Sequence, residues 1–245
     1  MNRVLLLLLL PFVFLRAEQV YANFVVEAMQ SASLAFDASG TIQTITVDVS
    51  SEVKKNQVVA ELFNADIKAS LDVAKAEEAS AKIAYEYAQK DFDRYAQVKD
   101  VIDRAKFDAM ELALKRAKVM LDQASANVAY REVLLQKTAI KAPFDGVISE
   151  KNIELGDVVS TASNKNQLKL QSKHDRKLIL EFDQKYFNVV SVGDVFRYKI
   201  ATDEHEGRVV KIYPSTNPQN RKLKAEVYAK DILVGYFGDG YIEGK

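Results

Sequence analysis

Side chains that could do chemistry are few in this chain, and they are scattered. The chain contains no cysteine among its 245 residues, which excludes thiol catalysis and metal sites built on cysteine ligands. The only two histidines, His174 and His205, are far apart in sequence. His205 lies in the acidic run 203–206, which could hold a divalent cation weakly or form an exposed polar loop between strands. We therefore expect neither a metal site nor a cofactor.

Motifs of known enzymes are missing as well. There is no GxSxG motif, no glycine-rich phosphate loop and no HExxH motif, and carboxylates are too frequent in residues 65–136 to single out a catalytic pair. Lys plus Arg and Asp plus Glu number 34 each, so the charge balance does not indicate a basic surface for nucleic acid. We expect a protein that is not an enzyme and that binds no nucleic acid.

The first residues have the three parts of a secretory signal peptide. Arg3 supplies a short basic region, residues 4–15 supply an apolar segment, and the VYA sequence at 20–22 supplies a cleavage site. A retained membrane anchor is the alternative, but about a dozen apolar residues interrupted by Pro11 are fewer than the roughly 20 that span a bilayer. The pattern predicts export and cleavage after Ala22.

Residues 65–136 have the composition of long helices. They include no Gly or Pro, and apolar residues recur with the 3.5-residue spacing of a coiled coil, interrupted once in each half by a charged residue, Glu78 and Arg131. Two seams of matching length predict an antiparallel hairpin that reaches about 50 Å at 1.5 Å per residue. The seams consist of Ile67, Leu71, Ala74, Ala81, Tyr85, Ala88, Phe92 and Tyr95, and of Phe107, Met110, Leu114, Ala117, Leu121, Ala124, Val128 and Leu135.

A short turn at residues 99–103 separates the two predicted helices. Asp103 can cap the N-terminus of the second helix. Lys99 lies at the C-terminal end of the first helix, where a positive charge interacts favourably with the helix dipole. Arg94 lies near the end of the first helix. By itself it is typical of an exposed arginine that pairs with Asp91 or Asp93.

The segments on either side of the helices resemble each other. GTIQTITVDVSSEV from Gly40 and GVISEKNIELGDVV from Gly146 align without gaps. A few strands with one apolar face do not bury that face alone, so we expect the two halves to pair as one small β-sandwich from which the helices emerge. Residues 173–245 contain the further strand-like segments LILEF, DVFRYKI, EGRVVKIY and KLKAEVYA, whose spacing predicts a small β-barrel.

These segments together resemble a known family. VSSEVKKNQVVAEL before the helices and IKAPFDGVISEKNIELGDVV after them are similar to the two halves of the split biotinyl-lipoyl domain of HlyD/RND-type membrane fusion proteins, which are periplasmic adaptors. The APFDG motif at 142–146 and the LGD motif at 155–157 are the most specific part. Four further residues match the family's barrel: Gly193, Gly207, Pro214 and Arg221.

The resemblance implies an α+β fold. It predicts an elongated modular protein with a split biotinyl-lipoyl-like β-sandwich, an antiparallel α-helical coiled-coil hairpin inserted in it, and a C-terminal small β-barrel. A carrier of lipoyl or biotin would present a modified lysine where this chain has the helical insert, so no cofactor is implied. The expected divisions are a signal peptide at 1–22, an N-terminal strand and the first lipoyl-like half at 23–64, the hairpin at 65–136, the second half at 137–172, and the barrel at 173–245.

The chain departs from the family pattern in its turns. Ser50 and Asn56 replace two turn glycines of the first half, which predicts a slightly altered turn. Members that dock onto TolC-type channels carry an Arg, a Leu and a Ser at the hairpin tip. Here Arg94 matches the Arg, Val98 replaces the Leu, and Asp103 stands where the Ser would be.

The family's function is the transport of small molecules across two membranes. The resemblance implies an adaptor subunit of a tripartite efflux system, located in the periplasm and peripherally associated with the inner membrane. Its partners would be an inner-membrane pump, RND-type by hairpin length, a TolC-type outer-membrane channel, and further copies of itself in a hexamer. The family's membrane-proximal domain is built from both chain ends and needs a long extension after the barrel. Because this chain stops soon after Gly240, we expect that domain to be absent or truncated. The alternative function is a periplasmic coiled-coil scaffold or chaperone that grips client proteins with the same helices.

Overall fold

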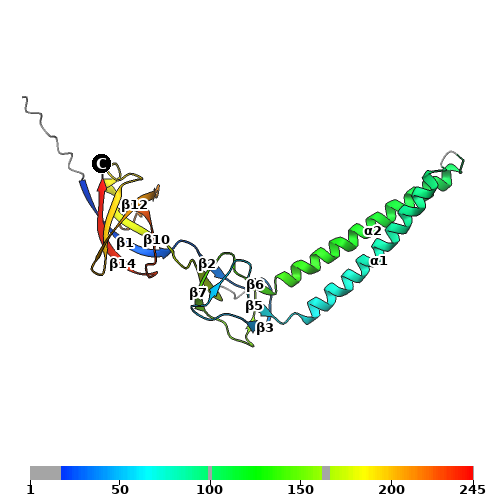
Figure 1. The fold of residues 1–245 in the computed structure, drawn as a ribbon, viewed down its shortest axis with the longest axis horizontal. Coiled ribbons are helices and arrows are strands. Elements are labelled where there is room, and N and C mark those ends of the chain that lie inside the picture. The colour runs from blue at the N-terminus through cyan, green and yellow to red at the C-terminus, as the bar shows by residue number, and fades with distance from the viewer. Residues whose placement is uncertain (1–17, 99–100, 162–165, 245) are drawn as a thin grey trace, which may run out of the picture. The chain divides into compact units, whose positions relative to one another are not determined.

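The computed structural model describes residues 18–98, 101–161 and 166–244, and it divides the chain into two compact units (Figure 1). The first unit joins both ends of the chain, up to Gln30 and from Ser172 onward. The second unit is the continuous stretch Ser31–Gln171, which contains both long helices. The chain therefore passes between the units twice.

A closed six-stranded β-barrel forms the first unit, in the strand order β1-β10-β13-β12-β11-β14. Side chains alternate between the interior and the solvent, so that every second residue of β1 from Val20 to Ala28 is buried. The bounds are β1 (Glu18–Ala28), β10 (Asp175–Asp183), β11 (Val195–Ile200), β12 (Asp203–Ile212), β13 (Lys222–Lys230) and β14 (Phe237–Gly244), with one turn of 3₁₀ helix, η1 (Gln184–Tyr186), after β10.

Strand β1 corrects two expectations from the sequence. The sequence places an N-terminal strand with the first sandwich half and a barrel in residues 173–245 alone, but β1 lies between β10 and β14 and closes the barrel. The predicted cleavage after Ala22 falls inside β1. Small and apolar residues that alternate along a half-buried strand have the same spacing as a cleavage motif, so residues 20–22 fit both patterns and the cleavage stays a prediction. The rest of the expected leader, residues 1–17, lies outside the described residues.

A chain that begins at Asn23 is expected to be much less stable than one that begins at Glu18. The shorter chain loses the fully buried Val20 and Ala22 and keeps only three of the eight residue pairs between β1 and β14. The loss should amount to roughly 3 kcal/mol or more, from one buried valine and several hydrogen bonds of about 1 kcal/mol each. Urea unfolding of the two purified chains measures the difference, and equal midpoints would contradict the role of residues 18–22.

The second unit contains a β-sandwich of two four-stranded sheets, β2-β9-β7-β4 and β6-β5-β3-β8. The two sequence repeats pair with each other: Gly40 pairs with Val159, and the equivalent Gly146 pairs with Val53. One continuous apolar core includes residues of both repeats. The expectation that the look-alike segments fold together is confirmed. The bounds are β2 (Ser31–Leu34), β3 (Gly40–Ile45), β4 (Glu52–Val53), β5 (Val58–Leu62), β6 (Ala139–Lys141), β7 (Gly146–Lys151), β8 (Val158–Val159) and β9 (Leu168–Gln171).

The turns of the two repeats are also equivalent. Asp48 N donates a hydrogen bond to Ser51 Oγ at 2.9 Å, and at the matching positions Glu154 N donates to Asp157 Oδ2 at 2.8 Å. Each turn is therefore closed by a side-chain oxygen of the residue three positions later. The symmetry of the repeats extends from the strands to the side chains that cap their turns.

Serine and asparagine keep the backbone that glycine would adopt in these turns. Ser50 has φ 69° where the equivalent Gly156 has φ 89°, and Asn56 has φ 66°. The left-handed conformation is strained for serine, and it is held here by a hydrogen bond from Ser50 N to the carbonyl of Ile148 at 2.8 Å. The altered turn that the sequence predicts is thus not seen at the level of the backbone.

The two equivalent glycines that begin β3 and β7 differ in the space around them. A Cβ atom on Gly146 would lie 2.3 Å from the carbonyl oxygen of Gln171, whereas one on Gly40 would meet only the Leu62 side chain at 3.3 Å. We expect Gly146→Ala to destabilise the protein by about 1–3 kcal/mol through overpacking, and Gly40→Ala by much less. Denaturant unfolding of both variants provides the test. Equal losses would show that the contact with Gln171 does not constrain residue 146.

Helices α1 (Ala65–Ala96) and α2 (Arg104–Gln136) connect β5 to β6. An ion pair between Lys75 and Glu132 and a ring contact between Phe92 and Phe107 show that the helices run antiparallel. The stretch between the two sandwich halves is therefore a helical hairpin.

Candidate docking surface on the helical hairpin

The hairpin leaves and re-enters the sandwich through two strands that pair with each other, since Ala60 of β5 pairs with Ile140 of β6. At this junction the buried side chains of Asn64 and Thr138 are hydrogen-bonded, with Asn64 Nδ2 3.2 Å from Thr138 Oγ1. The Thr138 hydroxyl in turn donates to the carbonyl oxygen of Leu135 at 2.7 Å, in the last turn of α2. The two helices are thus held together where they meet the sandwich.

Side chains at the predicted seam positions face the partner helix. Every one of them is buried or half-buried, while the residues between them are mostly exposed. Leu71, Ala74 and Val128 form a buried cluster toward the sandwich end. Toward the tip, the rings of Phe92 and Phe107 pack with centroids 5.4 Å apart. The spacing in the sequence therefore identifies the residues along which the helices meet.

Two polar side chains interrupt the seam, as the sequence indicates. Glu78 Oε1 accepts a hydrogen bond from Ser125 Oγ at 2.6 Å. Nε of Arg131 is buried and has no hydrogen-bond partner among the described residues, and the guanidinium lies 5.8 Å from the centre of the Tyr130 ring. A polar group in an apolar seam is satisfied in one alignment of the helices only, so Glu78 favours this register over shifted ones.

The three residues predicted for the tip lie in different surroundings. Arg94 is 76% exposed, and its Nη2 atom lies 3.3 Å from Asp91 Oδ1, which is the surface ion pair that helical spacing allows. Val98 follows the end of α1 and is exposed. Asp103 caps α2, with Oδ1 accepting a hydrogen bond from Ala105 N at 3.3 Å, as the sequence predicts. Lys99, expected at the C-terminal end of the first helix, lies outside the described residues.

The sequence analysis missed one feature of the tip. Val101 is 84% exposed, more than any other large apolar side chain of the described chain, and it lies in the same turn as Val98. Turns are usually polar, so apolar residues at 98, 101 and 102 were the available signal. An exposed apolar group on a turn is typical of a contact surface.

Loss of the Asp103 cap is expected to loosen the tip without unfolding the protein. Removing an N-cap carboxylate costs about 1 kcal/mol of local helix stability, which corresponds to roughly fivefold faster amide hydrogen exchange in the first turn of α2. Asp103→Ala should show this increase, and Asp108→Ala, one turn further along, should show much less. Equal exchange in the two variants would contradict the capping role.

The described residues include few side chains arranged for catalysis or metal binding. No group of three or more His, Asp or Glu side chains is arranged to hold a metal ion within residues 18–98, 101–161 and 166–244. Glu204 in the acidic run is bound to Lys199 at 3.0 Å, and the His205 ring stacks on Tyr198 at 5.6 Å. No helix in these same ranges combines the length and hydropathy that crossing a membrane requires.

Sequence comparison places these features among known proteins. The family of CzcB-like barrel-sandwich hybrid domains matches residues 30–168, which span the sandwich and the hairpin. The multidrug resistance protein MdtA of Escherichia coli is 21% identical over 156 residues, and that of Cronobacter turicensis is 22% identical over 156 residues. Each match covers 63% of this chain and 38% of the relative, so the chain corresponds to well under half of the length of these relatives.

Solved structures share the fold at low sequence identity. A MacA-MexA chimaera with the α-hairpin of Pseudomonas aeruginosa MexA has a TM-score of 0.71 at 17% identity, over 93% of this chain and 81% of the other. The membrane fusion protein Spr0693 of Streptococcus pneumoniae R6 has a TM-score of 0.72 at 18% identity, over 92% of this chain and 99% of the other. With a barrel, a split sandwich and an inserted hairpin in one chain, and a family match across the last two, this protein belongs to the membrane fusion protein (periplasmic adaptor) family.

Proposed function

We propose that this chain is the adaptor subunit of a tripartite efflux system. In this role it lies in the periplasm, peripherally associated with the inner membrane, and links an inner-membrane transporter of the RND type to a TolC-type outer-membrane channel for export of drugs or other small molecules. The observation that carries the proposal is a long helical hairpin with the exposed side chains of Val98 and Val101 at its tip. A hydrogen bond between Asn64 and Thr138 joins its two helices where they meet the sandwich. The family consists of non-enzymatic structural components of efflux systems, and the proposed role needs no catalysis and no cofactor.

The tip has the chemistry to bind the ends of other helices. Both side chains of the Arg94–Asp91 ion pair are exposed, and exposed ion pairs contribute little to the stability of a protein. The guanidinium can therefore exchange Asp91 for carbonyl oxygens or carboxylates of a channel, with which it forms two parallel hydrogen bonds. Val98 and Val101 would be buried in the same contact, and Asp103 would hold the turn in shape.

Charge reversal at the tip is expected to reduce efflux. Arg94→Glu removes the hydrogen-bond donor and places a negative charge opposite the carbonyl oxygens or carboxylates of the channel. Because a charge-assisted hydrogen bond contributes roughly 1.5–3 kcal/mol, channel binding should weaken about tenfold or more. Drug susceptibility of a strain whose only copy is Arg94→Glu measures the effect, with protein level held equal. Lys82→Glu, an exposed charge reversal in the middle of α1, is the matched control. Unchanged efflux in Arg94→Glu would argue against docking through the tip.

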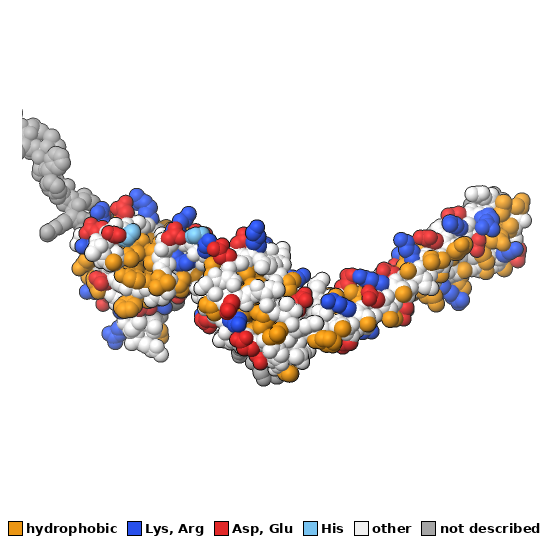
Figure 2. Space-filling model, turned by 60° about the horizontal axis from the view of Figure 1, so that its bottom comes forward, with side chains coloured by type: hydrophobic (Ala, Val, Ile, Leu, Met, Phe, Trp, Pro, Cys, Tyr) orange, Lys and Arg blue, Asp and Glu red, His pale blue; other side chains and the backbone are white. Residues whose placement is uncertain are grey.

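A second apolar stripe runs along each helix on the side away from its partner. Its members follow the seam positions by two residues, which is about 200° around a helix, and all of them are exposed. Figure 2 shows apolar side chains along the hairpin between charges of both signs. The largest members are Val73, Ile83 and Tyr87 on α1 and Leu112, Val119, Tyr130 and Val133 on α2.

These stripes support self-association. They lie on opposite edges of the hairpin, so the α1 edge of one copy can pack against the α2 edge of the next. The same contact repeated around an axis is heterologous and closes into a ring, which fits the hexamer that we propose for the working assembly. A tube of hairpins would then present six tips to the channel.

A charge placed on the stripe is expected to reduce self-association. Val119 and Met120 are neighbours on α2 and are each 65% exposed, but only Val119 belongs to the stripe. Burying an unpaired carboxylate at a helix interface is costly, so Val119→Asp should lower the cross-linked oligomer yield of the full chain while Met120→Asp leaves it close to wild type. Equal yields for both variants would contradict the stripe as the contact.

The same exposed stripes could serve a coiled-coil scaffold or chaperone that grips client proteins. That function predicts client binding that survives Arg94→Glu and a phenotype that does not depend on any pump gene. Drug susceptibility measured with and without the transporter gene separates the two functions.

A further inference from the structure

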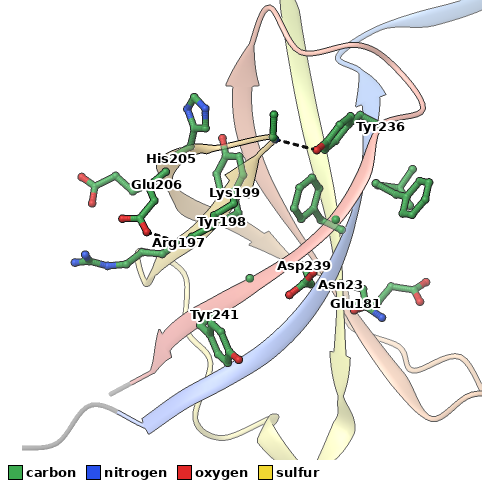
Figure 3. Close-up of a pocket in the computed structure, with 17 residues that line it drawn as sticks. Asn23, Glu181, Arg197, Tyr198, Lys199, His205, Glu206, Tyr236, Asp239 and Tyr241 are labelled. Carbon is green, nitrogen blue, oxygen red and sulfur yellow. Dashed lines mark hydrogen bonds and ion pairs between the residues drawn. The ribbon is translucent and has the colours of Figure 1, made fainter.

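In the closed barrel, a short ladder joins β11 and β14. Pairing between β11 and β14 ends at Tyr198 and Gly240. Beyond this point Ala201 N donates a hydrogen bond to the Tyr236 hydroxyl at 3.2 Å. A cavity of about 1270 Å³ lies beside this end of the ladder, lined by residues of β1, β10, β11, β12 and β14 (Figure 3). Pockets for drug-sized ligands are usually about 300–1,000 Å³, so the space is ample for one such molecule.

Aromatic rings form the floor and rim of this barrel cavity. The buried Phe24 ring lies 5.3 Å from the Tyr198 ring and 6.4 Å from the Tyr236 ring, measured between centroids. Gly238 lets β14 approach this floor closely, since a Cβ atom there would lie 2.8 Å from Phe24, which is itself fully buried. At the rim, Phe237 is 78% exposed. The Tyr198 ring is covered by Phe196 and His205, so a flat aromatic ligand would cover Phe237 and stack on the half-buried Tyr236 ring.

The charges of the lining favour a positive ligand. Its two cations, Arg197 and Lys199, are each bound to a glutamate, at 2.9 and 3.0 Å. The carboxylates of Glu206 and Asp239 have no ion pair or hydrogen bond to any residue that the structure describes. Figure 3 shows Asp239 beside Asn23, on the strand that also carries Tyr241. Glu206 lies opposite Arg197 in the β11–β12 ladder, so Asp239 is the less compensated of the two carboxylates. Negative charge next to exposed aromatic faces attracts organic cations.

We propose that the barrel cavity is a binding site for aromatic organic cations. The rings of Tyr236 and Phe237 would hold the ligand's flat part, and Glu206 and Asp239 would hold its positive charge. The inference concerns the barrel unit alone and does not depend on the efflux role. It gives the barrel a ligand in addition to its structural part in the chain.

Binding of ethidium, a planar aromatic cation, to the purified full chain tests the proposal by fluorescence anisotropy. We expect saturable binding that Asp239→Asn weakens by about two- to fivefold, since the charge is partly exposed, and that Phe237→Ala weakens by about three- to tenfold. 8-Anilinonaphthalene-1-sulfonate, an aromatic anion, should bind much more weakly than ethidium. The matched controls are Asp37→Asn, an exposed carboxylate outside the barrel, and Phe187→Ala, an exposed phenylalanine of the barrel unit that does not line the cavity.

Three outcomes would overturn the proposal. The first is no saturable ethidium binding by the wild-type chain. The second is binding that both control variants weaken as much as Asp239→Asn and Phe237→Ala do. The third is binding that Val119→Asp abolishes and Asp239→Asn leaves intact, which would place the dye on the hairpin stripe. Thermal unfolding of each variant shows whether it is folded, and Glu206→Gln provides a second test of the charge if Asp239→Asn unfolds.

Discussion

The second unit depends on the pairing of two look-alike β segments that lie far apart in the sequence. The ladders themselves are short, since β4 and β8 each contain two residues. Few hydrogen bonds hold them, so most of the stabilisation comes from the apolar core that the two halves share, at about 25 cal/mol per Å² of buried apolar surface. Neither half has this core without the other, and a chain inserted between them must leave and return at neighbouring strands.

That constraint makes the hairpin possible. Because β5 and β6 pair directly, the helices that follow and precede them start side by side, and Asn64 and Thr138 are close enough to bond. Along the hairpin the seam is mostly half-buried, as expected for two helices with no third partner. The stability of the hairpin therefore depends on the length of its helices, on their helix-forming residues and on the junction with β5 and β6 that the two helices share. The same two-helix geometry leaves one apolar edge exposed on each helix, and these edges are available to other chains.

The barrel is assembled under a different constraint, because its strands come from both ends of the chain. A sheet of β10 to β14 alone would have two open edges, and β1 removes them by pairing with β10 on one side and β14 on the other. Closure is tight where glycines of β14 lie against Phe24 and Phe196. The β11–β14 ladder ends at Tyr198 and Gly240, and the cavity lies beside this end.

The sequence by itself determined the features that depend on local spacing. The seam of the hairpin, the Asp103 cap and the repeat of Gly40 and Gly146 follow from periodicity and alignment, because the residues that interact there recur at fixed intervals along the chain. Only the tertiary structure decided where β1 belongs, since an alternating strand has the same pattern whichever sheet it joins, and its first residues also match a cleavage motif. The exposed Val101 and the cavity beside Asp239 likewise required coordinates, because exposure and charge neutralisation depend on residues that are distant in sequence.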